Sequence, residues 1–346
     1  MKKYSVHLRV ILPAVALFIL IANFEAAISG ASFGLDFCIH SVIPALLPFF
    51  VLSTLLSSTL TYESMGFLAP VRRLCAIPKG QEGIFFIGLL CGYPIGAQNI
   101  YNAYSAQRID QDTARRLLGF CSNAGPSFIF GVTSLLFDTW YIPWILWGIQ
   151  ILSAIFVGIL IPGKVNKASA PPVPQRITLS HALSQSLRAI ANVCGWVILF
   201  RTAIEILNRT IGCLIPEILS VVLAGILELT NGCFVLHKIV GENLRFVFCS
   251  GFLSFGGICV FMQTKSVTKE LGIASYALGK TLQTSISVFT ASLLQMLLFP
   301  ATGNSPLINS ILFGSSVMFF LLVFFCLRKK EVAFYENFLY NKKNAA

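Results

Sequence analysis

Four short polar segments interrupt long apolar stretches of this chain, and they hold the side chains best suited to chemistry. They are Gly92-Tyr93-Pro94-Ile95-Gly96, Asn123-Ala124-Gly125-Pro126-Ser127, Glu228-Leu229-Thr230-Asn231-Gly232 and Ser254-Phe255-Gly256-Gly257. Glycine and proline break helices, and lipid cannot hydrogen-bond the backbone groups that a break frees. Matched breaks in two halves of one chain are typical of a transporter binding site at the middle of the membrane.

A half-helix that starts at such a break presents free backbone N–H groups and about half a positive charge, so it can bind an anion or a carbonyl oxygen. The alternative is that the small residues only let helices pack closely. We expect Asn123 and Ser127 to face the same cavity as Ser254 and Thr230. The predicted substrate-binding residues at the breaks are Gly92, Tyr93, Pro94, Gly96, Asn123, Gly125, Pro126, Ser127, Thr230, Asn231, Gly232, Ser254, Gly256 and Gly257.

Three charged residues lie in apolar surroundings. Glu228 is a candidate coupling-ion residue that binds a cation or carries a proton; alternatively, it is a structural acid that hydrogen-bonds the broken backbone beside it. We expect it near the bilayer middle, within reach of residues 123–127. Arg201 and Glu205 are spaced for an ion pair on one helical face, which could simply lie near the membrane interface. Arg201 is also a candidate counter-ion for an anionic substrate.

The composition indicates an integral membrane protein. Hydrophobic residues make up 56% of the 346 residues and charged residues only 11%, against about 25% charged in an average soluble domain. The net charge of +11 does not indicate a nucleic-acid partner, because the basic residues gather at the ends of apolar segments, as in cytoplasmic loops. Both termini are therefore expected in the cytoplasm, with an even number of crossings.

The sequence lacks the patterns that would indicate a metal site, a catalytic triad or nucleotide binding. The ten cysteines form no Cys-x-x-Cys pair and the four histidines lack metal-ligand spacing, so we expect no metal site. No serine has a histidine and an acid at a recognisable catalytic spacing, and no phosphate-binding Walker loop is present. We expect neither an enzyme nor a cofactor.

The order of segments predicts an all-α polytopic membrane protein with about eight membrane segments, some of them re-entrant. The first span is expected near 8–25, although the basic start could also belong to a signal peptide. Pro44 and Pro48 predict a kink or break in 33–61, and 265–280 reads as a charged loop. The expected divisions are an N-terminal transmembrane helix (1–30), a first repeat (31–162), a Pro-rich linker (163–179), a second repeat (180–300), a C-terminal transmembrane helix (301–327) and a basic cytoplasmic tail (328–346).

The two repeats are predicted from the order of their elements: a long helix, a broken helix, a charged connector and a second broken helix. Phe-Cys-Ser occurs at 120–122 and again at 248–250, each time after an arginine, Arg116 or Arg245. The connector 108–116 reads as a solvated segment or as an entry funnel. The competing interpretation is a plain helical bundle without pseudo-symmetry.

The four motifs, in this order and followed by Gln263, resemble those of the YlbJ/SpoVV sporulation integral membrane proteins, which belong to the nucleoside-recognition, or Gate, domain group. The resemblance covers about residues 33–327 and adds Gln263 to the candidate binding residues. It implies two Gate-like halves, a place in the outer forespore membrane of the mother cell, and a role in moving dipicolinic acid toward the spore. This chain has Gln98 where the family often has a basic residue.

The leading hypothesis is therefore transport of a small organic anion, with dipicolinic acid as the substrate that the resemblance implies. A nucleoside-like substrate and a non-transporting scaffold in spore maturation are the alternatives. The expected partners are the lipid bilayer, the anion, a coupling cation, and other sporulation membrane proteins or a second copy of the chain. A polar cavity lined by the four motifs would favour transport, whereas tightly packed, dry motifs would favour a scaffold.

Overall fold

The computed structural model is helical throughout the part of the chain that it describes, which is residues 2–60, 65–134, 136–161, 163, 177–239, 241–299 and seven positions between 310 and 321. Five helical stretches in this part are long and apolar enough to cross a membrane: Phe24–Leu56, Ile142–Leu160, Leu179–Ile211, Glu242–Leu271 and Ala274–Leu298. The predicted all-α membrane class is confirmed, but the predicted count of about eight segments is not. Most of the linker 163–179, the start of 301–327 and the tail 328–346 lie outside the described residues.

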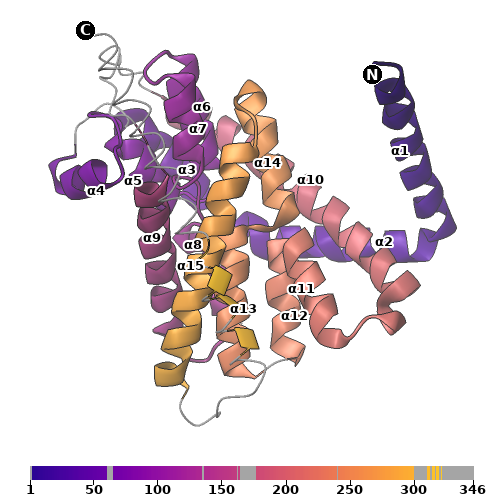
Figure 1. Cartoon of the computed structure of the whole chain (residues 1–346). Coiled ribbons are helices and arrows are strands. Elements are labelled where there is room, and N and C mark those ends of the chain that lie inside the picture. The colour runs from indigo at the N-terminus through magenta and orange to yellow at the C-terminus, as the bar shows by residue number, and fades with distance from the viewer. Residues whose placement is uncertain are drawn as a thin grey trace, which may run out of the picture.

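The N-terminal helices stand partly apart from the rest (Figure 1). Helix α1 (Lys2–Ala22) leads into α2 (Phe24–Phe37), a π-helical turn (Cys38–Val42) and α3 (Ile43–Leu60). Pro44 cannot donate the helical hydrogen bond, and the chain passes this position with the wider π turn instead of a full break. The apolar part of α1, Val10–Ala22, is shorter than the five spanning stretches, so the span predicted near 8–25 is not among them.

The first pair of broken helices follows a short 3-10 turn (Gly66–Leu68) and α4 (Ala69–Leu74). Helix α5 (Glu82–Leu90) stops at the first glycine motif and α6 (Ile95–Ser105) starts after it. Helix α7 (Gln111–Leu118) is the charged connector, capped by the Asp110 carboxylate on the Thr113 N–H at 2.7 Å. An extended segment then leads to α8 (Pro126–Thr133) and the membrane-length helix α9 (Ile142–Leu160).

The second half also contains two broken helical segments. The long helix α10 (Leu179–Ile211) and a 3-10 turn (Gly212–Leu214) precede α11 (Glu217–Leu227), which stops at Glu228, where α12 (Leu229–Ile239) begins. Helix α13 (Glu242–Phe255) is separated from α14 (Gly257–Thr268) by Gly256 in a left-handed conformation. A 3-10 turn (Lys269–Leu271) then leads to α15 (Ala274–Leu298). The predicted loop 265–280 is thus mostly helical, because only residues 272–273 lie outside helical turns.

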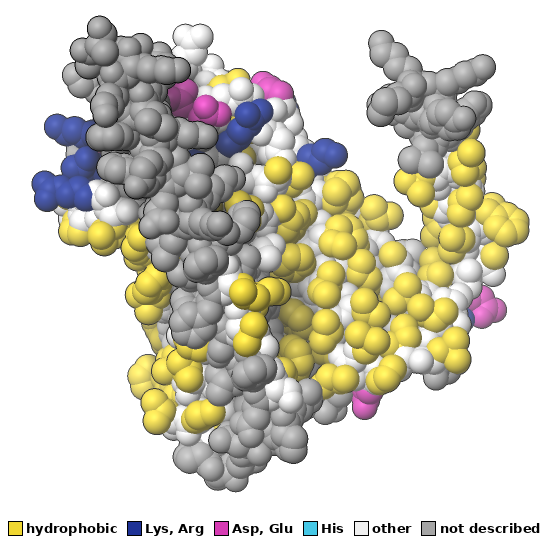
Figure 2. Space-filling view, viewed as in Figure 1, with side chains coloured by type: hydrophobic (Ala, Val, Ile, Leu, Met, Phe, Trp, Pro, Cys, Tyr) yellow, Lys and Arg dark blue, Asp and Glu magenta, His cyan; other side chains and the backbone are white. Residues whose placement is uncertain are grey.

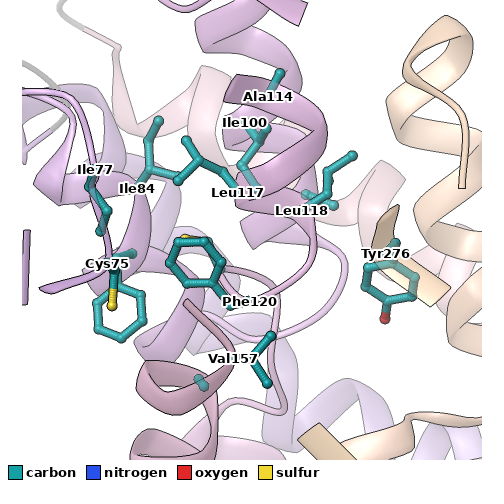
Figure 3. Packing of buried hydrophobic residues seen from close by; sticks show 14 of the residues in the cluster. Cys75, Ile77, Ile84, Ile100, Ala114, Leu117, Leu118, Phe120, Val157 and Tyr276 are labelled. Carbon is teal, nitrogen blue, oxygen red and sulfur yellow. The ribbon is translucent and has the colours of Figure 1, made fainter. Parts of the chain in front are cut away.

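The core sits where these elements cross. One cluster of buried side chains joins α5, α6, α7, α9, α14 and α15, and Figure 3 shows Phe120 beside Cys75 and Val157 within it. A second cluster joins α8, α9, α12, α13 and α15, and a third joins α3 to α10. Helix α10 also lies along α2, so the N-terminal helices attach to the rest mainly through α10.

The outer surface suits a bilayer. Large apolar side chains are exposed on α1, α2, α3, α9 and α10, among them Phe18, Phe24, Leu52, Trp144 and Leu199. In Figure 2 hydrophobic side chains cover the middle of the visible face, and the visible Lys and Arg side chains gather near its upper end. Trp140 and Trp144 are exposed at the start of α9, as expected for residues at a membrane interface.

Candidate functional site

In the first half, the two broken segments cross each other through glycine. Gly92 has φ of +72°, and a Cβ placed on it would lie 2.6 Å from the Gly125 nitrogen. Gly88 and Gly96 lie against the Cys121 carbonyl in the same crossing. The first and second motifs therefore touch backbone to backbone, which only residues without a side chain allow.

The second half contains an equivalent crossing. Gly257 has φ of +78°, and a Cβ on it would lie 3.1 Å from the Leu229 nitrogen and 3.3 Å from the Glu228 Cα. Gly232 packs directly against Gly225, so α11 and α12 form a close pair. The third and fourth motifs thus meet as the first and second do.

A small cavity lies between the two crossings. Its volume is about 50 Å³, and residues of both halves line it together with apolar side chains of α3 and α10. Because one water molecule needs about 10–15 Å³ measured in this way, the cavity can hold only a few waters. The predicted site residues that line it are Gly92, Tyr93, Gly125, Ser127, Glu228, Thr230 and Gln263.

Tyr93 connects the two crossings. It follows Gly92 in the first motif and lines the cavity, while its ring end lies 3.4 Å from the position of a Cβ on Gly256. The four motifs therefore lie near one another, but the fourth motif adds no residue to the cavity lining.

The Glu228 carboxylate lies at the N-terminus of α12 and is 2% exposed. One oxygen accepts hydrogen bonds from the Thr230 N–H (3.0 Å) and hydroxyl (2.8 Å), and the other from the Asn231 N–H (2.7 Å) and side-chain amide (2.9 Å). Four donors suit an ionised carboxylate, which only accepts. The arrangement is that of a helix cap, and it matches the structural alternative considered from the sequence.

Arg201 reaches the same cap from α10. Its guanidinium donates to the Asn231 side-chain oxygen at 3.2 Å, pairs with Glu205 at 3.4 Å and lies 4.3 Å from the centre of the Phe33 ring. The ion pair expected between Arg201 and Glu205 is present. Arg201 does not line the cavity, so its contact with the site passes through Asn231.

Asn123 and Ser254 lie outside the cavity, contrary to the expectation that they face it together with Ser127 and Thr230. Both are fully buried and belong to a chain of amide hydrogen bonds. The Gln283 amide donates to Asn123 at 2.9 Å and to the side-chain oxygen of Gln150 at 3.2 Å, and Gln150 donates to the Ser254 hydroxyl. This network joins the second and fourth motifs through α9 and α15.

The remaining predicted residues support the crossings. Pro126 starts α8, while Pro94 precedes α6 and lines a separate hollow between α6 and α10. The connector 108–116 is only partly solvated, because Arg116 is buried and donates to the carbonyls of Cys75 (2.7 Å) and Ala76 (2.6 Å). It ties loops together and does not line the cavity.

Sequence reasoning missed three buried polar side chains of the network: Gln150, Lys280 and Gln283. Gln150 stands alone in a long apolar stretch, which could have marked it. Lys280 was assigned to the loop 265–280, where its charge needed no explanation. Among the described residues, no three His, Cys, Asp or Glu side chains lie close enough together to hold a metal ion.

Comparison with known proteins agrees with the motif resemblance. Over 310 residues, which cover 73% of this chain and 72% of the relative, the chain is 24% identical to the sporulation integral membrane protein YlbJ of Bacillus subtilis (strain 168). No family model and no solved structure matches the chain. The apolar spans therefore indicate an integral membrane protein, and its sequence is similar to that of YlbJ.

Proposed function

We propose that the protein transports a small organic anion, with dipicolinic acid as the substrate and the outer forespore membrane as its location. The observation that carries this proposal is the cavity between two glycine crossings, lined by polar groups of both halves. Transporters built from two repeats bind their substrates at such a place, between discontinuous helices. The order of elements in 82–133 and 217–268 also supports two related, Gate-like halves.

The cavity of about 50 Å³ is far smaller than the roughly 300–1,000 Å³ of an ordinary small-molecule site. In the proposed cycle this conformation is the closed one, and the substrate enters when the walls separate. The walls that face the crossings are Val42 of the π-helical turn, Leu46 of α3, and Val193 and Val197 of α10. These apolar side chains can part without breaking hydrogen bonds or ion pairs.

The tight packing of the same motifs favours a second candidate, a non-transporting scaffold in spore maturation. In that case Glu228 would serve only as the cap of α12, and the glycine crossings would only hold the helices together. The two candidates differ in one measurable respect, which is flux of substrate across a membrane.

The test is uptake of labelled dipicolinate into vesicles that contain only this protein, with and without gradients of protons or sodium. Transport predicts uptake above that of protein-free vesicles and competition by unlabelled dipicolinate. A nucleoside such as uridine, offered in place of dipicolinate, tests the nucleoside-like alternative. Correctly folded protein without uptake of either compound would contradict transport and favour the scaffold.

A further inference from the structure

Lys280 is a lysine buried in the middle of the protein. It lies on α15, is 0% exposed, and belongs to a helix that is long and apolar enough to span the membrane. An ionisable side chain inside a membrane protein is costly unless it is paired, so its default interpretation is functional. Nothing in the site described above needs its positive charge.

The neighbours of Lys280 accept hydrogen bonds but carry no charge. Its ammonium nitrogen lies 3.1 Å from the Asn123 side-chain oxygen and 2.7 Å from that of Gln283. It also lies 5.1 Å from the centre of the Tyr93 ring and 5.7 Å from that of Tyr276, whose faces attract cations. Among the described residues, no carboxylate lies within 4.0 Å of it. The half-buried cation Arg201, by contrast, has Glu205 as its partner.

Hydroxyl groups beside Lys280 also have unused hydrogen-bonding capacity. The hydroxyls of Tyr93, Tyr276 and Thr264 are buried and interact with one another, but none of them makes a hydrogen bond of good geometry. Tyr276 and Thr264 are 0% exposed. Buried polar groups in proteins nearly always have good partners, so three weakly bonded hydroxyls near a cation without a carboxylate partner could turn to donate to a bound ligand. One cation and several hydroxyl donors suit a carboxylate.

We propose that Lys280 is the cation that binds a carboxylate of the transported substrate, and that the Tyr93 ring separates it from the central cavity in the closed conformation. Tyr93 is the residue that both lines the cavity and covers Lys280. The inference rests on the proposed transport function and narrows the substrate class to carboxylates.

The charges around the cavity give the substrate a preferred orientation. The Glu228 carboxylate borders the cavity on the side of α12 and repels an anion. Lys280 lies behind Tyr93 and attracts one. Once the Tyr93 ring has turned aside, a carboxylate that moves toward Lys280 is therefore stabilised both by weaker repulsion from Glu228 and by stronger attraction to Lys280. A neutral ligand of the same shape experiences neither effect.

The experiment measures ligand binding to the purified full-length protein by equilibrium dialysis. The probes are dipicolinate and its uncharged diamide, pyridine-2,6-dicarboxamide, which has nearly the same shape. We expect the wild-type protein to bind dipicolinate at least tenfold more tightly than the diamide. Lys280→Gln should weaken dipicolinate binding at least tenfold and leave diamide binding unchanged, whereas Lys280→Arg should stay within a few fold of wild type.

Lys265→Gln is the matched control, because Lys265 is exposed on α14 and should leave both affinities unchanged. Thermal unfolding adds a readout that separates binding from structure. Removal of a needed structural group lowers the melting temperature, whereas removal of an unpaired buried charge leaves it unchanged or raises it. We expect Lys280→Gln to melt at or above the wild-type temperature.

If the wild-type protein does not discriminate dipicolinate from the diamide, or if Lys280→Gln binds both as wild type does, the proposal is wrong. Should Lys280→Gln fail to fold, Tyr276→Phe and Thr264→Val each remove one of the hydroxyls near Lys280, and normal dipicolinate binding by both would equally overturn the proposal. Vesicle uptake distinguishes failure of the transport proposal from failure of the proposed role of Lys280. Binding that depends on Lys280 without uptake refutes transport alone, and uptake unaffected by Lys280→Gln refutes the role of Lys280 alone.

Discussion

Glu228 shows how one buried acid can be held without a cation partner. All four hydrogen bonds to its carboxylate come from Thr230 and Asn231, the second and third residues of α12. The charge also lies at the positive end of that helix. The acid is therefore stabilised by the break in the backbone that it borders, and its burial alone is no argument for ion coupling.

The first prediction concerns Glu228→Gln. Glutamine replaces one carboxylate oxygen, which accepts two hydrogen bonds, with an NH₂ group that cannot accept any. The N–H and side-chain donors of either Thr230 or Asn231 therefore lose their acceptor. We expect a loss of about 1–3 kcal/mol in the free energy of unfolding, measured by thermal or denaturant unfolding in detergent. Glu217→Gln at the exposed start of α11 is the control and should change stability little.

The same variant tests ion coupling. If Glu228 binds a cation or carries a proton, vesicle uptake by Glu228→Gln should lose its dependence on sodium or on pH. If uptake per folded molecule keeps the wild-type response to both, Glu228 is only the cap of α12. Wild-type stability in this variant would contradict the four-donor arrangement itself.

At the scale of residues, the sequence could mark Glu228 but not Lys280. Glu228 stands alone in an apolar run, so its charge was conspicuous. Lys280 follows Lys265, Lys269 and Glu270 within fifteen residues, and a cluster of charged residues this close in sequence usually indicates a solvated loop. Its burial depends on α15 starting at Ala274 and turning that face toward Asn123, which is a tertiary contact that no local pattern contains.

At the scale of elements, each half is held together by a pair of broken segments that cross at glycine. The second prediction compares Gly92→Ala with Gly148→Ala. At Gly92 the methyl group meets the Gly125 backbone at 2.6 Å and the backbone φ is positive, so the first crossing must open. We expect severe loss of folded protein, measured by size-exclusion chromatography and melting temperature.

Gly148 lies within α9, and a methyl group there meets nothing within 4 Å. Gly148→Ala should be neutral or stabilising by up to about 1 kcal/mol, because alanine favours helix. Gly257→Ala should behave like Gly92→Ala, since it has positive φ and closely approaches Leu229. A Gly257→Ala protein as stable as Gly148→Ala would contradict an equivalent crossing in the second half.

The position of each break could be predicted from sequence, because glycine and proline act locally on the backbone. The convergence of the breaks was inferred from their matched order, and Tyr93 beside Gly256 agrees with it. The division of the polar side chains could not be inferred. Ser127 and Thr230 face the cavity while Asn123 and Ser254 face away, because Gln150 and Gln283 provide partners on the other side.

At the scale of the whole molecule, hydropathy predicted the membrane class, whereas the count of about eight segments stays a prediction beside the five membrane-length stretches of the described residues. Apolar residues also form short half-helices, such as α5 and α11, which are too short to cross. Length and composition alone cannot separate a half-helix from part of a span. Whether the halves superpose stays a prediction, although each half contains two pairs of helices separated by a break: α5–α6 and α7–α8 in the first, and α11–α12 and α13–α14 in the second.

The last prediction concerns movement of the cavity walls. Helix α10 packs on α2 and α3, so these helices can move together against the crossed breaks. Val193 on α10 and Val260 on α14 both line the cavity, and in the proposed opening they must separate if an organic anion is to enter between these helices. Cysteines at these two positions, joined by a short thiol cross-linker, should abolish vesicle uptake, and cleavage of the linker should restore it. The control joins cysteines at Val193 and Val197, both on α10, which modifies the same wall without tying it to α14. Uptake that persists with Val193 and Val260 fully cross-linked would mean that substrate does not pass between α10 and α14.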